Sequence, residues 1–197
     1  MADAAKRRIG LMGGTFNPIH YGHTMVAQFT AEFGGFDEVW LMLSPANPLK
    51  PDTPSADDNA RIEMLLSATA DIPHVKACLV EFDLPRPSFT ANTLRHLSDI
   101  YPDCTFTPII GADNWLRFNC WREYEFILQN FPPAIYPRPG YPVDKKMLPE
   151  GVRDIDNCPV IQLSSTFIRR AITSGHCVSQ FLPTGVYDYI MTNSLYQ

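Results

Sequence analysis

Two glycines and two histidines lie close together near the start of the sequence, in the segment 13–23, which reads GGTFNPIHYGH. Gly13 and Gly14 lack a Cβ atom, so the backbone can turn sharply there and a ligand can approach it closely. His20 and His23 are three residues apart, which puts both imidazoles on one side of a helix start. Because imidazoles and the N–H groups of a helix start all donate hydrogen bonds, the segment favours binding of a phosphate group.

Simpler roles and a metal site are alternatives for this segment. Two glycines alone fit an ordinary turn between a strand and a helix, and the histidines could merely cap that helix or be half-buried. The segment contains neither GxxxxGK[ST] nor GxGxxG, so it is not one of the common nucleotide-binding loops. A zinc site is disfavoured, because His20 and His23 need at least one further ligand and no other Cys or His lies nearby in the sequence.

A second segment with anion-binding features is 163–170, which reads LSSTFIRR. Ser164 or Ser165 can cap a helix that starts here. Ser165, Thr166 and Arg169 then share one face of that helix, which suits a chain of phosphates, although an ordinary capped helix with exposed arginines is also consistent.

The residues expected to face the core are Met25, Val26, Phe29 and Phe33 in the first helix and Phe167, Ile168, Ala171 and Ile172 in this one.

Apolar runs and helical spacing predict the elements that position these two segments. Strands are expected at 8–12, 38–43, 75–82, 105–110, 133–136 and 160–163. Helices are expected at 22–33, 59–69, 90–101, 123–129, from 165 onward and at about 183–193, with proline-rich loops at 44–55 and 137–159. This alternation predicts an α/β fold, a Rossmann-like open, mostly parallel sheet with helices on both faces. Ligands of such folds bind at the carboxyl ends of the strands, where Gly13 and Gly14 are expected.

Length, charge and cysteine content narrow the class of protein. The 197 residues suit a single domain spanning 1–197, and 45% hydrophobic residues can form a sizeable core. A net charge of −5 disfavours a nucleic-acid partner, while a local cluster of positive groups can still hold a small anion. The five cysteines are scattered and contain no CxxC, which indicates reduced thiols and a cytoplasmic protein. Neither a signal peptide nor a membrane span is indicated, because long apolar runs are missing.

Taken together, the two segments resemble the signatures of a known superfamily. HYGH at 20–23 and SSTFIR at 164–169 resemble the HxGH and SSTxIR signatures of nucleotidyltransferases, and more narrowly those of bacterial nicotinate-nucleotide adenylyltransferases. Further matching segments, in the same order, are RIEML at 61–65, SFTANTL at 88–94, GADNW at 111–115, RPGY at 138–141 and LPTGVYDYIMTNSLY at 182–196. The chain departs from that family at Asn17, which is often Asp, at 47–50, which reads NPLK where PPHK is frequent, and at Arg122, where a Tyr often follows the tryptophan.

This resemblance implies an adenylyltransferase that joins ATP and nicotinate mononucleotide, giving deamido-NAD and pyrophosphate in NAD biosynthesis. It also implies Mg²⁺ on the ATP phosphates and no covalent enzyme intermediate. The residues implied in catalysis are His20, His23 and Arg169. Those implied in ATP binding are Gly13, Gly14, Thr15, Phe16, Lys50, Ser165 and Thr166. Those implied in mononucleotide binding are Asn17, Thr90, Gly111, Asp113, Trp121 and Arg122, and no residue is assigned to a metal.

Related activities and other classes remain as alternatives. The acceptor could be nicotinamide mononucleotide or pantetheine phosphate, although Trp121, suited to stacking on a pyridine ring, favours a pyridine nucleotide, and Arg122 could pair with the carboxylate of the acid. A fragment of an aminoacyl-tRNA synthetase is disfavoured by the acidic charge and the missing KMSKS. A nucleotide-sensing module is disfavoured by the presence of both histidines and Arg169. The partners expected are small molecules and no membrane, and a homo-oligomer is left open.

Overall fold

One sheet organises the computed structural model, which describes residues 5–45 and 56–197. Its strands are β1 (Arg7–Gly14), β2 (Glu38–Leu43), β3 (Val75–Cys78), β4 (Cys104–Gly111), β5 (Ala134–Tyr136) and β6 (Arg153–Asp154). They lie in the order β3-β2-β1-β4-β5-β6, and all neighbouring strands run parallel. The order reverses between β1 and β4, so the carboxyl ends of these two strands border the crevice in which ligands of such sheets bind.

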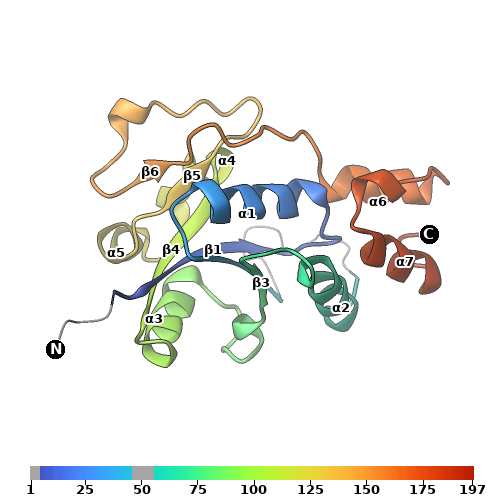
Figure 1. The fold of residues 1–197 in the computed structure, drawn as a ribbon, viewed down its shortest axis with the longest axis horizontal. Helices are drawn as coiled ribbons and strands as arrows, with labels where there is room; N and C mark the ends of the chain where they lie inside the picture. The colour runs from blue at the N-terminus through green and yellow to red at the C-terminus, as the bar shows by residue number, and fades with distance from the viewer. Residues whose placement is uncertain (1–4, 46–55) are drawn as a thin grey trace.

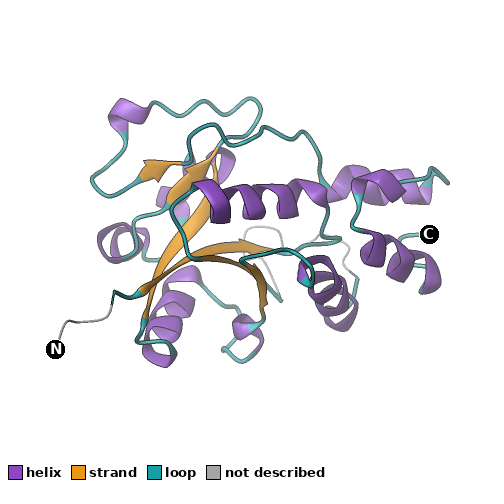
Figure 2. Cartoon of the chain, viewed as in Figure 1, coloured by secondary structure: helices purple, strands orange, loops and turns teal. Residues whose placement is uncertain are grey.

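Helices cover both faces of the sheet. They are α1 (Tyr21–Phe33), α2 (Asp58–Thr69), α3 (Thr90–Ile100), α4 (Ala112–Trp115), α5 (Tyr124–Asn130), α6 (Ser165–Thr173) and α7 (Thr184–Thr192). Short 3-10 turns lie at Val80–Phe82, Phe118–Cys120, Lys145–Met147 and Ser179–Phe181. Residues of α1, α2, α6 and α7 share one hydrophobic core, and residues of α3, α4 and α5 share another. Figures 1 and 2 show α1 and α3 on opposite sides of the sheet, which confirms the expected Rossmann-like α/β fold.

The alternating direction of side chains along a strand explains why the buried strands are apolar throughout. Ile9 and Leu11 of β1 belong to the core under α3, whereas Met12 belongs to the core under α1. In β2, Trp40 and Leu41 divide between the two cores in the same way. Both faces of the central strands are therefore covered, as a parallel sheet requires.

Two helix starts are fixed by side-chain caps, of which the sequence analysis indicated the one at α6. The carboxylate of Asp57 accepts a hydrogen bond from the N–H of Ala60 at 2.7 Å, which begins α2. The hydroxyl of Ser164 accepts one from the N–H of Phe167 at 3.2 Å, which begins α6. Of the two serines considered for that cap, Ser164 is the one used, and Ser165 becomes the first helical residue.

Two strand predictions and one loop prediction need correction. The strand expected at 75–82 ends at Cys78, because Val80–Phe82 forms a 3-10 turn. The strand expected at 160–163 does not form, and Val160 is exposed, without a neighbouring strand to pair with. The outer strand of the sheet is instead β6, inside the predicted loop 137–159. A strand of two residues leaves no alternating pattern in the sequence, so the pattern alone does not reveal it.

The exposure of three large apolar side chains differs from expectation. Met25 is 47% exposed, Phe33 is 75% exposed and Phe167 is 48% exposed, although each was expected to face the core. The buried face of α1 consists instead mainly of small residues, Thr24, Val26, Ala27, Thr30 and Ala31. Small side chains let the helix approach the sheet closely. Of the four predicted residues, Val26 is buried and Phe29 packs partly buried against the core, while Met25 and Phe33 are exposed.

Candidate active site

A cavity of about 290 Å³ opens at the carboxyl ends of β1 and β4. Gly13 and Gly14 line it at the end of β1, and Gly111 lines it at the end of β4. The other lining residues that the sequence singled out are Thr90, Trp121 and Arg122. Residues from four separate segments of the chain therefore surround one space, at the position where such folds bind ligands.

The backbone turns directly after β1. Phe16 has a φ of +41°, in the left-handed region that non-glycine residues seldom adopt. Its buried ring packs edge-on against the ring of His23, with 5.0 Å between the ring centroids. A Cβ atom on Gly14 would lie 2.7 Å from the Phe16 ring, so glycine is required there by packing.

The two predicted phosphate-binding segments are in direct contact, although about 150 residues separate them (residue separations 147 and 152). Arg169 of α6 donates from Nη1 to the backbone oxygen of Asn17 at 2.7 Å. The hydroxyl of Ser165 donates to the backbone oxygen of Pro18 at 2.9 Å. Arg169 also donates from Nη2 to the hydroxyl of Thr166 at 3.3 Å. The start of α6 is thereby fixed against the turn that precedes α1.

His20 and His23 stack on each other at the start of α1. Their ring centroids are 3.7 Å apart and the ring planes differ by 19°. The backbone N–H of His20 donates to Nδ1 of His23 at 3.4 Å. A neutral imidazole that accepts at Nδ1 carries its proton on Nε2, so this contact favours an Nε2–H donor on His23.

The charge state of His20 differs from a simple imidazolium. Burial, and after it the positive charge of Arg138, lower the pKa of His20 from 6.5 to about 4. His20 is therefore neutral at pH 7 and contributes hydrogen bonding rather than positive charge. The positive charge near the His20 ring is that of Arg138.

Arg138 is a residue of this region to which the sequence assigned no role. It lies just after β5, and its Nε contacts the carboxylate of Asp113 at 3.4 Å. Asp113 follows β4 through Gly111, where a Cβ atom would come within 2.4 Å of the Asp113 carboxylate. The RPGY segment at 138–141, which resembles a family motif, is the signal in the sequence that points to this arginine.

The wall of the cavity that contains Thr90, Trp121 and Arg122 combines aromatic rings with buried polar atoms. Trp121 packs on Phe118 at 5.4 Å between centroids, and the guanidinium of Arg122 lies 4.7 Å from the centre of the Phe89 ring. Thr90 is the first residue of α3, whose first N–H groups have no partner within the helix. The buried polar atoms of the lining residues that have no hydrogen-bond partner among the described protein atoms are Trp121 Nε1, Ser88 Oγ and Glu81 Oε2.

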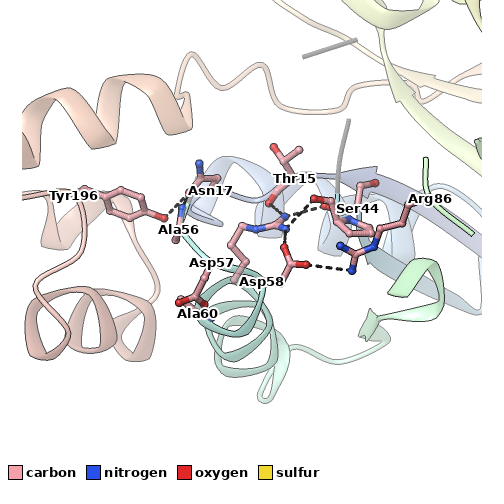
Figure 3. Close-up of polar contacts among 11 residues, drawn as sticks. Thr15, Asn17, Ser44, Ala56, Asp57, Asp58, Ala60, Arg86 and Tyr196 are labelled. Carbon is pink, nitrogen blue, oxygen red and sulfur yellow. Dashed lines mark hydrogen bonds and ion pairs between the residues drawn. The ribbon is translucent and has the colours of Figure 1, made fainter. Parts of the chain in front are cut away.

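Two predicted site residues remain to be placed, Lys50 and Asn17. Lys50 lies outside the described residues. Asn17 is buried, and both of its oxygens accept hydrogen bonds from the protein. Its backbone oxygen accepts from Arg169. Its Oδ1 accepts from the hydroxyl of Tyr196 at 2.7 Å and from the N–H of Ala56 at 3.2 Å (Figure 3). Asn17 therefore holds the turn in place, which the sequence did not reveal.

Within residues 5–45 and 56–197, no group of three or more His, Cys, Asp or Glu side chains is arranged to hold a metal ion. In the same ranges no helix has the length and apolar character needed to cross a bilayer. The donors that surround the turn are mainly N–H groups and hydroxyls. Such donors suit the oxygen atoms of an anion.

Comparison with known proteins agrees with this geometry. The family model for cytidylyltransferase-like proteins matches residues 11–171. A probable nicotinate-nucleotide adenylyltransferase of Bacteroides thetaiotaomicron is 43% identical over 190 residues, covering 96% of this chain and 94% of the relative. A protein of the same name from Flavobacterium johnsoniae is 39% identical over 191 residues, covering 96% of this chain and 99% of the relative.

Solved structures share the fold at lower sequence identity. Plasmodium falciparum nicotinic acid mononucleotide adenylyltransferase complexed with NaAD superposes with a TM-score of 0.78 at 21% identity, covering 96% of this chain and 97% of that one. A putative nicotinate-nucleotide adenylyltransferase from Vibrio parahaemolyticus gives a TM-score of 0.70 at 23% identity, covering 96% and 95%. The near-complete match to curated relatives shows that the chain belongs to the nicotinate-nucleotide adenylyltransferase family, within the cytidylyltransferase-like proteins.

Proposed function

We propose that this protein transfers the adenylyl group of ATP to nicotinate mononucleotide, giving deamido-NAD and pyrophosphate. One observation carries the proposal: the turn between β1 and α1, with its two histidines and Arg169, lies at the same strand ends as a cavity walled by Trp121 and Thr90. A phosphate site beside an aromatic pocket suits the joining of a nucleoside triphosphate to a pyridine nucleotide.

The ATP phosphates would bind where the starts of α1 and α6 meet. Two helix starts at one turn offer unpaired N–H groups and partial positive charge. Arg169 and Thr166 add donors from the side of α6, and His23 adds its Nε2–H from α1. In this proposal Gly13, Gly14, Thr15 and Phe16 form the backbone wall along the triphosphate, and Lys50 adds charge.

The reaction needs little acid–base chemistry. An oxygen of the 5′-phosphate of the mononucleotide attacks the α-phosphorus of ATP, and the bond from α-phosphorus to the bridging oxygen breaks, releasing pyrophosphate. A phosphate monoester is already ionised at neutral pH, since its second pKa is about 6, so no proton has to be removed first. Catalysis then consists of aligning the two phosphates and stabilising the negative charge that moves to the leaving group.

The histidine pair suits this task. His20 is neutral at pH 7, so it needs no negatively charged partner in the free protein and can donate a hydrogen bond to an incoming anion. A bound phosphate would raise the pKa of His20, because a neighbouring negative charge favours its protonated form. In this proposal the two histidines and Arg169 contact the α-phosphate and the pyrophosphate as charge develops there.

A divalent cation, most simply Mg²⁺, is the expected companion of ATP. The groups around the turn are hydrogen-bond donors, which bind phosphate oxygens and not a cation. The ion would therefore be held mainly by the ATP phosphates and by water, as is usual for Mg²⁺. When bound, the cation would neutralise part of the triphosphate charge and help to orient the phosphates. Asp113, at the end of β4, is the carboxylate of the predicted site that could reach its water shell or a ribose hydroxyl.

The pyridine ring would stack on Trp121. A nicotinate carboxylate would find positive partners in the N–H groups at the start of α3 and in the guanidinium of Arg122 on the same wall. The acid is therefore the preferred acceptor over the amide, which carries no charge for these groups to pair with. Gly111 allows the close approach of the mononucleotide to the end of β4.

The test is pyrophosphate release from ATP and Mg²⁺ with nicotinate mononucleotide, nicotinamide mononucleotide or pantetheine phosphate as the acceptor. Rapid release with the acid alone is expected. Preference for the amide or for pantetheine phosphate would replace the acceptor, and absence of release with all three would overturn the proposed activity. An Arg122→Ala chain that keeps the wild-type preference for the acid would remove Arg122 from the recognition of the carboxylate.

A further inference from the structure

Arg61 is buried beneath the candidate site and holds its backbone by hydrogen bonds. Its side chain in α2 is 2% exposed. The guanidinium donates from Nη1 to the backbone oxygens of Thr15 at 3.0 Å and Ser44 at 2.8 Å, and from Nη2 to that of Pro45 at 3.2 Å (Figure 3). Thr15 follows β1 and Ser44 follows β2, so one side chain joins the ends of two neighbouring strands.

The shape of a guanidinium explains why an arginine does this. Carbonyl oxygens at the ends of adjacent parallel strands have no further strand N–H to accept from. A planar fork with five donors can satisfy several of them in fixed directions, which the single ammonium of a lysine cannot. Arg61 therefore fixes where the backbone of the turn begins.

Asp58 extends this contact toward the other wall of the cavity. Its Oδ1 accepts from Arg61 Nη2 at 2.5 Å, and its Oδ2 accepts from Arg86 Nη2 at 3.3 Å (Figure 3). Arg86 lies in the loop before α3, two and four residues before Ser88 and Thr90, which line the cavity. The three charged side chains thus form a continuous chain from the phosphate turn to the mononucleotide wall.

We propose that Arg61, Asp58 and Arg86 are positioning residues that set the distance between the two substrates. This inference rests on the proposed function. None of the three residues lines the cavity, so they act through the turn at Thr15 and the loop before α3. In-line attack on α-phosphorus depends on this distance, because an error of about 1 Å can cost a hundredfold in rate.

Two substitutions separate the outer link from the buried one. Asp58→Asn keeps an oxygen toward Arg61 but presents an amide N–H toward Arg86, so the outer contact is lost, while Arg61 keeps its hydrogen bond and loses its counter-charge. Arg86→Gln removes the same link from the other side. Asp37→Asn is the matched control, because it breaks an arginine pair, Arg8 with Asp37 at 2.9 Å, at the opposite end of β1.

The test measures KM for each substrate, kcat and the thermal midpoint. Arg86→Gln is expected to raise KM for nicotinate mononucleotide about three- to tenfold, with KM for ATP and the thermal midpoint close to wild type. Asp58→Asn should raise the same KM by about as much and should also lower the thermal midpoint, because it removes the counter-charge of the buried Arg61. The double variant should equal Asp58→Asn, because both remove the one outer link. Arg61→Lys should lower kcat about tenfold or more even when both substrates are saturating. The control should leave kcat and both KM values unchanged.

The kinetic and binding results together distinguish failure of this inference from failure of the proposed function. Unchanged kinetics in both Asp58→Asn and Arg86→Gln would overturn the positioning role, even if Arg61→Lys fails to fold. A rise in KM and a fall in thermal midpoint of equal size in all variants, the control included, would show that the three charged side chains contribute only to the stability of the fold. Binding of nicotinate mononucleotide, followed by tryptophan fluorescence, separates the two proposals: a wild-type chain that binds without turnover contradicts the activity, and one that neither binds nor turns over overturns both.

Discussion

The two walls of the candidate site differ in how their polar groups are engaged. On the phosphate side, the backbone oxygens of residues 15, 17 and 18 all accept hydrogen bonds from side chains of distant segments, namely Arg61, Arg169 and Ser165. On the mononucleotide side, Trp121 Nε1 and Ser88 Oγ are buried and have no partner among the described protein atoms.

This difference fits what each wall has to do. Phosphoryl transfer needs fixed donors, since they stabilise the developing charge without reorganising at the moment of reaction. Recognition of one acceptor among several needs polar atoms that pair only with the correct ligand, because an incorrect ligand leaves them buried and unpaired. The backbone of the proposed phosphate wall is therefore held by the protein itself, with His20 Nδ1 as a buried atom that has no partner among the described atoms, and the proposed mononucleotide wall leaves several side-chain atoms for a ligand to pair.

Removal of Arg169 should have the largest effect. Arg169→Ala removes the proposed phosphate donor and also the contact to the backbone oxygen of Asn17, so kcat/KM should fall about 10²- to 10³-fold. Steady-state kinetics with both substrates measures this. Arg170→Ala is the control on the same helix, because Arg170 is exposed and lies outside the predicted site. A tenfold or smaller loss in the Arg169 variant would show that the phosphate wall does not depend on this contact.

The charge state of His20 should appear in the pH dependence of stability. The folded chain has the pKa of His20 lowered to about 4, so between pH 6.5 and 4 the unfolded chain binds a proton that the folded chain does not. Stability is therefore fully present above pH 6.5 and decreases as the pH falls, by about 2 to 3 kcal/mol at pH 4.5. Urea unfolding at pH 7 and pH 4.5 should show this component in the wild type and its absence in His20→Asn. Identical pH dependence in the two chains would contradict the buried neutral imidazole.

Trp121 tests the other wall. Trp121→Ala should raise KM for nicotinate mononucleotide about tenfold to a hundredfold, since base stacking on an aromatic ring contributes about 1 to 3 kcal/mol, while KM for ATP stays near wild type. Trp121→Phe keeps a ring without the N–H donor and should recover most of the loss. A rise in KM for ATP of the same size would mean that the two walls are not separate.

The smallest effect is expected at Tyr196. Burial raises the pKa of Tyr196, so the hydroxyl stays protonated and donates to Asn17 Oδ1. Tyr196→Phe removes one hydrogen bond, and the free energy of unfolding should fall by about 1 kcal/mol. KM for ATP should rise only a few-fold, with KM for the mononucleotide unchanged. Tyr141→Phe, at an exposed tyrosine, controls for the loss of a hydroxyl elsewhere.

The sequence predicted the parts of the site that depend on local pattern. A glycine turn after an apolar run, and serines before a helix, are local signals, and both segments lie where they were expected. Strand β4 was also predicted, although it contains Pro108, because the surrounding residues were strongly apolar. The contact between the two segments was not predicted, since the strand expected to lead into the second segment, at 160–163, does not form.

Contacts between distant residues could not be predicted. Arg61 and Tyr196 lie in segments that resemble the family, but their local pattern does not indicate what they contact, since their partners are backbone and side-chain oxygens far away in the sequence. The neutral state of His20 depends on burial and on Arg138, which only the fold brings close. The strand β6 was missed for a similar reason, because its two residues are defined by pairing with β5 rather than by their own pattern.

The contact between Arg169 and Asn17 has a consequence for the synthesis of the chain. The two residues are 152 positions apart, so the turn after β1 leaves the ribosome well before the helix that fastens it. At about 5 to 20 residues per second, roughly 8 to 30 seconds pass between the two events. A nascent chain can pair β1 with β2 during that time, but the contact between the turn and α6 forms only after α6 has left the ribosome. The proposed phosphate site is therefore completed well after the strands that surround it have been made.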